Sequence, residues 1–432
     1  MKSALIFYTT QYKEGGNLFK QVAHTLAQAK KREGMNVWCE PTESKAGIKA
    51  LLNNLILGGE TLDELHFVGH AGMYGPMFGT VDYPEQFSPH EIRTLRIPFA
   101  KGAEAYFHCC RSARWFAPFF ARTRGVPAHG FHWYTAFSTD PHRYKMVWPK
   151  DRDGKIYCFG CPGKKSHGLF ASLKKYTGRM QAEKLKKFIP EATEIDTSYD
   201  PVAELYHEVF TDIKVRIDEY GWIKKHLPKN AGRVLDIGCG NGALLRELSG
   251  QIIEGVGADV SNNLVKRAQA FSQNFQNLQF VKIDGPQLPF ADKSFDVVIS
   301  MLSFRYLDWD PVMKEIERIL KKEGKLLVID MVTAPVKWKE IFQFLSDKAI
   351  GYYQRYRNPD FHARLKRLVD HPDWRKMLQY NPIRAEHEMK WYLQSRFPGR
   401  KVEVINIGYN SRILAFDSVN MDDLRQINLT YP

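Results

Sequence analysis

The sequence predicts two consecutive α/β domains. In both halves of the 432-residue chain, short apolar runs alternate with helical patterns, which is typical of sheets covered by helices. An aperiodic, acidic and Pro-bearing segment, 190–201, separates the two alternations. Hydrophobic residues make up 44% of the chain, enough for two cores. We expect a first domain over 1–165, a basic connector and linker over 166–200, and a second domain over 201–432.

The formal charge of +14 favours contact with an anionic partner. Nucleic acid, anionic lipid and an acidic substrate all fit this charge, and so does a solvated basic surface. The excess is densest between Arg143 and Lys187, where three lysine doublets occur. The stretch runs from the end of the first domain into the expected connector, so the charge alone does not choose among these partners.

Cysteine usage and hydropathy indicate a cytoplasmic protein. Six cysteines in a chain of this length follow no regular framework, which favours reduced thiols over disulfides. No run approaches the roughly 18 apolar residues that a membrane span needs. The N-terminal ten residues are too briefly apolar for a signal peptide, and we expect a core strand there. The sequence does not specify an oligomeric state.

In the N-terminal half, the apolar runs predict parallel strands that alternate with helices. We expect strands at 4–8, 37–39, 64–69 and 103–109, and helices that contain Leu18 and Ile48 and that span 112–124.

Two of these strands end in residues that suit nucleophilic chemistry. His70 follows the strand 64–69, and Cys110 follows the strand 103–109. Because the carboxyl ends of neighbouring parallel strands meet at one edge, the two side chains converge. A thiol beside an imidazole and near a helix N-terminus has a depressed pKa.

This half resembles the caspase-like cysteine peptidases, the caspase, gingipain and CHAT group. The resemblance covers about residues 1–140 and implies a caspase-like α/β sandwich, with His70 as catalytic histidine and Cys110 as nucleophile. Two departures from the family pattern are Ala71 after the histidine and Cys109 before the nucleophile. The second leaves open which thiol reacts. The alternative is an inactive domain in which both cysteines are small buried hydrophobic residues.

Cys158 and Cys161 form a lone CxxC, with His142 and His167 nearby. Structural zinc normally needs a second pair of ligands, and a redox pair needs a helix N-terminus after a strand. We therefore expect loop cysteines and no metal.

In the C-terminal half, the run 234–242 (VLDIGCGNG) joins an apolar strand to a glycine-rich turn and then to a helix over 243–248. Glycines allow positive φ and a close approach of a ligand to the backbone. A further apolar run ends at Asp259, an acidic position that suits a ribose diol. A third strand, 278–283, ends before Asp284.

The remaining elements complete a second α/β alternation. We expect a fourth strand over 295–300, a helix over 311–322 with Asp310 as its N-cap, and a fifth strand over 326–330. An aromatic and basic insert, 337–398, precedes a final pair of strands at 402–407 and 412–416.

These motifs resemble the class I S-adenosylmethionine-dependent methyltransferases of the small-molecule "type 11" sort. The resemblance is close over about 230–332 and implies a seven-stranded Rossmann-like fold. It places Asp236, Gly238, Gly240 and Gly242 around the methionine part of S-adenosylmethionine. It also places Asp259 on the ribose hydroxyls and Asp284 at the adenine amine.

The sequence predicts a small-molecule or lipid-like methyl acceptor. The site after the fourth strand reads Ser300-Met301-Leu302-Ser303, which lacks the Asn-Pro-Pro-aromatic and Pro-Cys motifs of DNA methyltransferases. Methyl transfer needs mainly positioning and exclusion of water, and we assign no base. The N-terminal domain would then regulate the enzyme or recognise its substrate. Two alternatives are a cysteine peptidase with an accessory methyltransferase domain, and an RNA or protein methyltransferase.

Overall fold

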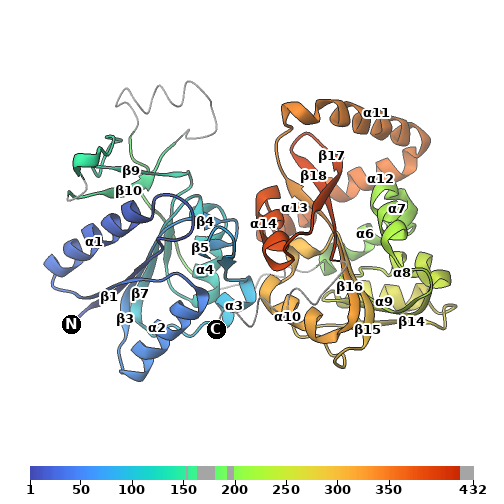
Figure 1. Cartoon of the computed structure of the whole chain (residues 1–432), viewed down its shortest axis with the longest axis horizontal. Coiled ribbons are helices and arrows are strands. Elements are labelled where there is room, and N and C mark those ends of the chain that lie inside the picture. Colours follow the sequence, from blue (N-terminus) through green and yellow to red (C-terminus); the bar gives the residue numbers. More distant parts are fainter. Residues whose placement is uncertain (152–153, 163–180, 192–198, 419–432) are drawn as a thin grey trace. The chain divides into compact units, whose positions relative to one another are not determined.

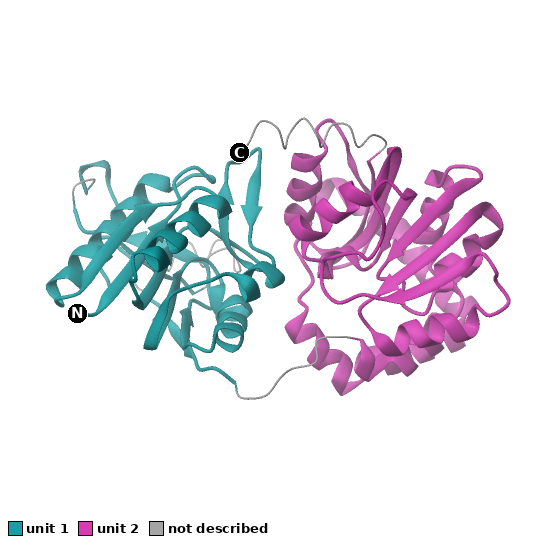
Figure 2. Cartoon of the chain, turned by 90° about the horizontal axis from the view of Figure 1, so that it is seen from below, with its two compact units in different colours: residues 1–194 teal, residues 195–432 magenta. Residues whose placement is uncertain are grey.

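The computed structural model describes residues 1–151, 154–162, 181–191 and 199–418. The chain divides into two compact units, 1–194 and 195–432, shown in separate colours in Figure 2. His167 of the expected connector lies outside the described residues. Each unit has its own sheet and its own core.

The first unit is built on a six-stranded sheet of order β11-β8-β7-β3-β1-β2. Five strands are parallel, and only β11 runs antiparallel to its neighbour β8. The strands are β1 (Ser3–Tyr8), β2 (Asn36–Pro41), β3 (Leu62–Val68), β7 (Phe99–His108), β8 (Ala128–Gly130) and β11 (Lys186–Phe188). The four strands expected from the sequence are confirmed, and the N-terminal ten residues do form the first of them.

Helices cover both faces of this sheet (Figure 1). On one face, α1 (Gly16–Arg32) packs on Ile6 and Tyr8. On the other, Leu5 and Phe7 pack with α2 (Lys45–Leu57), α3 (Pro89–Thr94) and α4 (Phe116–Arg124). Successive side chains of β1 point to opposite faces of the sheet because a strand has a two-residue period. The unit is therefore a three-layer α/β sandwich.

Small strands that carry little sequence signal complete the unit. They are β4 (Ala71–Gly72), β5 (Gly75–Gly79), β6 (Pro84–Gln86), β9 (Thr135–Ser138) and β10 (Tyr157–Gly160).

One expectation for this unit was wrong. The helix expected over 112–124 is interrupted: a 3-10 turn at Ser112–Arg114 precedes α4, because Trp115 leaves helical geometry at φ −145°. The described part of the expected connector contains β11, which pairs with β8, and Lys187 of this strand forms an ion pair with Glu104.

The second unit contains a seven-stranded mixed sheet of order β14-β13-β12-β15-β16-β18-β17. The first five strands in that order are parallel, and β18 runs antiparallel to both of its neighbours. The strands are β12 (Ala231–Ile237), β13 (Ile252–Asp259), β14 (Leu278–Lys282), β15 (Phe295–Met301), β16 (Leu320–Thr333), β17 (Val402–Ile407) and β18 (Ser411–Asp417). This confirms the Rossmann-like sheet with a terminal antiparallel pair.

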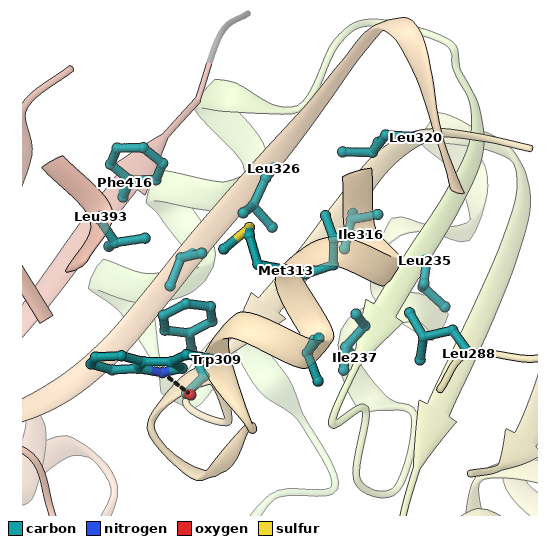
Figure 3. Packing of buried hydrophobic residues seen from close by; sticks show 14 of the residues in the cluster. Leu235, Ile237, Leu288, Trp309, Met313, Ile316, Leu320, Leu326, Leu393 and Phe416 are labelled. Carbon is teal, nitrogen blue, oxygen red and sulfur yellow. Dashed lines mark hydrogen bonds between the residues drawn. The ribbon is translucent and has the colours of Figure 1, made fainter. Parts of the chain in front are cut away.

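Helices again pack on both faces of the sheet. One face holds α7 (Ile217–His226), α8 (Ala243–Leu248) and α9 (Asn262–Phe271). The other holds α10 (Trp309–Ile319) and α14 (Glu386–Arg396). Figure 3 shows the second core, where Met313 and Ile316 of α10 lie over Leu326 of β16 and Trp309 donates to the Phe304 carbonyl at 3.0 Å.

The expected helix 311–322 was misplaced. Asp308, not Asp310, is the N-cap residue of α10, and the helix ends at Ile319. The following strand begins at Leu320, because Leu320 pairs with Phe295 of β15. The lysine- and glutamate-rich residues after Leu320 therefore continue in the strand, across a register shift that ends where Lys325 pairs with Val297.

The aromatic and basic insert 337–398 is largely helical. It contains α11 (Ile341–Arg357), α12 (Pro359–Asp370), α13 (Pro372–Tyr380) and α14. Another helix, α6 (Ala203–Val209), precedes the sheet and packs on α12. Over the described residues, no helix has both the length and the apolar character that crossing a bilayer demands.

Candidate functional site

The glycine-rich turn after β12 has the backbone geometry that its sequence predicted. Gly238, Gly240 and Gly242 have φ angles of 76°, 55° and 75°, which strain any other residue. A Cβ on Gly238 would lie 2.3 Å from the Ser303 side chain. Because these positions carry no side chain, a ligand can approach the backbone of the turn closely at the carboxyl edge of the sheet. The amides of the three glycines donate within the protein, to the Ala258 carbonyl, to Asp259 and to the Cys239 carbonyl.

Asp236 is a buried carboxylate one residue before the end of β12. Its side chain is 2% exposed, and its Oδ1 atom has no hydrogen-bond partner within the protein. Burial, together with the nearby charge of Asp259, raises the pKa of Asp236 to about 8. A buried acceptor without a hydrogen bond costs free energy unless a ligand donates to it. A cationic ligand with N–H groups would do so.

Asp259 ends the adjacent strand β13 and holds the glycine turn in place. Its Oδ2 atom accepts from the Gly240 amide at 2.9 Å, and its Oδ1 atom accepts from the Ser261 amide at 2.8 Å. Burial raises its pKa, while these amide donors oppose that rise. Each carboxylate oxygen has a second lone pair, so the group can also accept from a diol.

A segment before the sheet covers this turn, which the sequence did not predict. The ring of Tyr206, on α6, lies close to Gly240: a Cβ atom added to Gly240 would be 3.3 Å from that ring. Asn241 donates to the Phe210 carbonyl at 2.9 Å. Asp200 accepts from the Ser261 hydroxyl and from the Asn263 amide at the start of α9. No local motif marks these covering residues.

Aromatic rings gather beside the same cover. Tyr199 contacts Tyr206, Tyr306 and Trp374 with ring centroids 5.5, 5.9 and 5.7 Å apart, and its hydroxyl donates to that of Tyr306 at 3.2 Å. Burial raises the pKa of both Tyr199 and Tyr206. Trp374 comes from the insert and Tyr199 from the segment before the sheet, so these two parts of the chain meet beside the glycine-rich turn.

Asp284 does not join the buried acids. It lies two residues beyond β14, its side chain is 86% exposed, and it pairs with Lys282. It remains at the same edge of the sheet, one strand further out than Asp259. Its predicted contact with an adenine amine stays a prediction.

The residues after β15 also support the turn. The Ser303 hydroxyl donates to the Ile237 carbonyl at 2.6 Å and bonds the Ser300 hydroxyl at 2.8 Å. Leu302 between them has a positive φ of 60°. The Ser-Met-Leu-Ser sequence thus has a structural task, locking the end of β12 to the end of β15.

His70 and Cys110 of the first unit follow two neighbouring strands at one sheet edge, and their predicted pairing as histidine and nucleophile stays a prediction. Strands β3 and β7 are neighbours with Val68 opposite His108, and each predicted residue follows its strand by two positions. The Cys110 thiol lies 3.1 Å from the Thr135 hydroxyl. The His70 ring bonds the Glu14 carbonyl at 2.8 Å and packs edge-on against Phe19.

The two adjacent cysteines differ in environment. Cys109 is fully buried, and burial raises the pKa of its thiol well above the ordinary value. Cys110 is only half-buried. Of the two thiols that the sequence left open, Cys110 is the accessible one.

The CxxC pair lies on β10 and just after it. Cys161 is buried, and Cys158 packs beside the core of α1. Within the described ranges, no three His, Cys, Asp or Glu residues gather closely enough to hold a metal ion.

Known proteins match the C-terminal unit. Residues 235–328 match the family model described as a methyltransferase domain. The uncharacterized methyltransferase YcgJ of Bacillus subtilis is 28% identical over 170 residues, which is 38% of this chain and 62% of that protein. The chain thus spans less than two thirds of that relative's length.

Two further matches cover the same unit. The demethylmenaquinone methyltransferase of Thermotoga maritima is 28% identical over 178 residues, covering 38% of this chain and 74% of that protein. The crystal structure of a SAM-dependent methyltransferase from Aquifex aeolicus aligns with 16% identity and a TM-score of 0.35, over 52% of this chain and 99% of that one.

The buried unpaired carboxylate and the bare glycine turn fit the charged amino-acid end of S-adenosylmethionine. The C-terminal unit therefore contains a class I methyltransferase domain of the S-adenosylmethionine-dependent type, with S-adenosylmethionine as its cofactor.

Proposed function

We propose that the chain transfers a methyl group from S-adenosylmethionine to a small or lipid-like acceptor. The observation that supports this most is the unpaired Oδ1 atom of Asp236, buried beside three glycines of positive φ. In this proposal Asp236 and the turn hold the methionine end, Asp259 holds the ribose hydroxyls, and Asp284 bonds the adenine amine.

The cofactor supplies an already activated methyl group, so the protein's task is positioning and the exclusion of water. Tyr206 beside Gly240 and the Tyr199 cluster would form the wall that keeps water out. No acid or base is needed unless the acceptor must lose a proton. Except for the tyrosine hydroxyls, the surface of this wall is apolar, and it would therefore suit a flat or apolar acceptor.

The type of acceptor is supported by two observations. One is the Tyr199, Tyr206, Tyr306 and Trp374 cluster, whose apolar faces favour a ring or chain over a sugar or phosphate. The other is the similarity to a demethylmenaquinone methyltransferase, whose name indicates a lipid-like quinone as its acceptor.

The test is transfer of label from methyl-labelled S-adenosylmethionine in a fractionated cell extract. We expect label in the organic-soluble or small polar fraction, and none with Asp259→Ala. Asp292→Ala is the matched control, because it removes a carboxylate of the same unit that is 73% exposed. Label in protein or RNA would contradict the proposed acceptor and favour the RNA or protein alternative. Steeply salt-dependent polynucleotide binding would do the same.

A second candidate function is thiol chemistry at the N-terminal edge, with His70 and Cys110 as the catalytic pair of a caspase-like cysteine peptidase. It is supported by their equal offset beyond the neighbouring strands β3 and β7 and by the half-buried Cys110 thiol. In the leading proposal this unit regulates the methyltransferase or recognises its substrate.

A further inference from the structure

The outer face of α11 carries an exposed aromatic and apolar stripe. The members of this stripe recur every three, four or seven residues, so they share one side of the helix and of the turn before it. Their exposed fractions run from 57% to 89%, and they are Trp338, Phe342, Leu345, Tyr352 and Tyr356. Aromatic side chains this open to water are unusual for a helix that packs on a core.

The opposite side of α11 attaches the helix to its own unit. Asp347 accepts from the Ile407 amide at 2.8 Å, and the Phe344 ring lies 5.1 Å from that of Tyr409. None of the 17 residues of α11 is buried. The inner side of α11 is thus held by a hydrogen bond and a ring contact, while the apolar stripe points away from the unit's core.

Cations flank the stripe. Segment 337–357 holds five Lys or Arg residues against two carboxylates, for a net charge of +3. One of the two carboxylates, Glu340, pairs with Arg412, and the other, Asp347, is the amide acceptor just described. Lys348 lies over the Tyr409 ring at 4.5 Å, and Arg357 lies over the Tyr353 ring at 5.9 Å.

We propose that this face of α11 docks on the surface of an anionic lipid bilayer. Aromatic residues on one side of a helix, with Lys and Arg at its margins, are typical of helices that lie in the interfacial plane. Tyrosine and tryptophan favour that depth, because their rings are apolar and their polar ends stay hydrated. Seventeen residues give a helix about 25 Å long, which lies flat rather than spanning.

The charge of the partner follows from the same residues. The net charge of this segment, and of the chain at +14, complements anionic headgroups. A second copy of this chain would present the same cations to one another, which opposes self-association through this face.

α11 lies close in the chain to the proposed cofactor site, although the docking proposal does not require that site to be active. β16 ends at Thr333, at the same sheet edge as the cofactor turn, and α11 starts at Ile341. The next helix, α12, packs on α6 before the sheet, and the ring centroids of Phe361 and Phe210 lie 6.2 Å apart. In Figure 1, α11 runs along the top of the second unit.

The test is co-sedimentation of the full chain with lipid vesicles. We expect binding to phosphatidylcholine vesicles that contain phosphatidylserine, weak binding to phosphatidylcholine alone, and release by added salt. The variant Phe342→Glu/Tyr356→Glu changes two side chains that are each 84% exposed, so the fold should tolerate it. Its vesicle affinity should fall by about tenfold or more.

The matched control is Ile253→Glu, which adds a charge at a 70% exposed residue of the same unit. It lies at the start of β13, far along the strand from Asp259. The control should bind vesicles as the unaltered chain does, and both variants should retain affinity for S-adenosylmethionine. Equal vesicle binding by both variants would overturn the proposal. So would absence of vesicle binding together with a dimer that Phe342→Glu/Tyr356→Glu dissociates, since the stripe would then serve a second copy.

Discussion

The Gly240 amide donates to the Asp259 carboxylate at 2.9 Å, which ties the glycine turn after one strand to the end of the next. The acid therefore has two tasks in our proposal, shaping the turn and accepting from the ribose. Its removal should affect both, and the two effects can be measured separately.

Asp259→Ala should lower the affinity for S-adenosylmethionine by about a hundredfold or more, because it removes a charge-assisted acceptor and loosens the turn. Isothermal titration calorimetry measures the affinity. Thermal unfolding without cofactor measures how much stability the protein loses when the turn is loosened. Asp292→Ala should change neither. Unchanged affinity in a folded Asp259→Ala protein would remove the ribose assignment.

The stability of the cofactor-free protein should fall as the pH rises from about 4 to about 8 because of Asp236. Burial holds its folded pKa near 8, whereas an unfolded aspartate titrates near pH 3.9. Between these values the folded state keeps a proton that the unfolded chain loses, so its stabilising contribution is full below the lower value and lost through the upper one. Thermal unfolding across this window, compared with Asp236→Asn, checks the slope. An identical slope in the variant would assign the effect to another group.

The same carboxyl predicts proton release on cofactor binding. A cationic ligand favours the ionised form of Asp236, so binding near neutral pH should expel a proton. Calorimetry in two buffers of different ionisation enthalpy should give different heats for the unaltered chain. Equal heats would mean that Asp236 is already ionised or does not face the cation.

Gly238→Ala should abolish cofactor binding and destabilise the unit by about 1–3 kcal/mol. Its φ of 76° is strained for alanine, and the added Cβ would meet Ser303. Urea unfolding measures the loss. Gly221→Ala is the control, because Gly221 lies within α7 with open space around its Cβ position, and there alanine should be neutral or stabilising. Similar behaviour of the two variants would argue against the turn geometry.

Iodoacetamide should label Cys110 faster than Cys109 near neutral pH. Cys109 is fully buried with a raised pKa, whereas Cys110 is half-buried beside Thr135. Mass spectrometry of the labelled peptide separates the two sites. If His70 activates the thiol, His70→Ala should slow Cys110 labelling, while His90→Ala, on α3, should not. Equal, slow labelling of all cysteines would leave the first unit without a reactive thiol.

The central cofactor residues could be predicted because their signal is local. Gly238, Gly240 and Gly242 need positive φ, and Asp236 and Asp259 stand at the ends of adjacent strands. The covering residues could not be predicted in this way. Asp200 and Tyr206 reach the site from a segment more than 25 residues earlier in the chain, and only tertiary packing brings them there.

The errors in element boundaries have a similar cause. Asp310 and Pro311 are good residues for a helix start, yet the helix begins earlier, because proline is tolerated anywhere in the first turn. Lys321, Lys322 and Glu323 favour a helix, but the residues on either side of them, Leu320 and Lys325, pair with β15 and keep the segment in β16. Three-residue strands such as β8 and β11 are too short to show a period.

The hydrogen bonds from Asp200 to Ser261 and Asn263 have a practical consequence for anyone who wishes to isolate the methyltransferase half. The family match starts at Leu235, inside the first strand of the sheet. A fragment cut at that point would lack Asp200, Tyr206 and the Phe210 carbonyl, and would expose the turn that they cover. The natural folding unit begins before the recognisable domain, so a fragment that includes Tyr199 should bind cofactor where the shorter one fails.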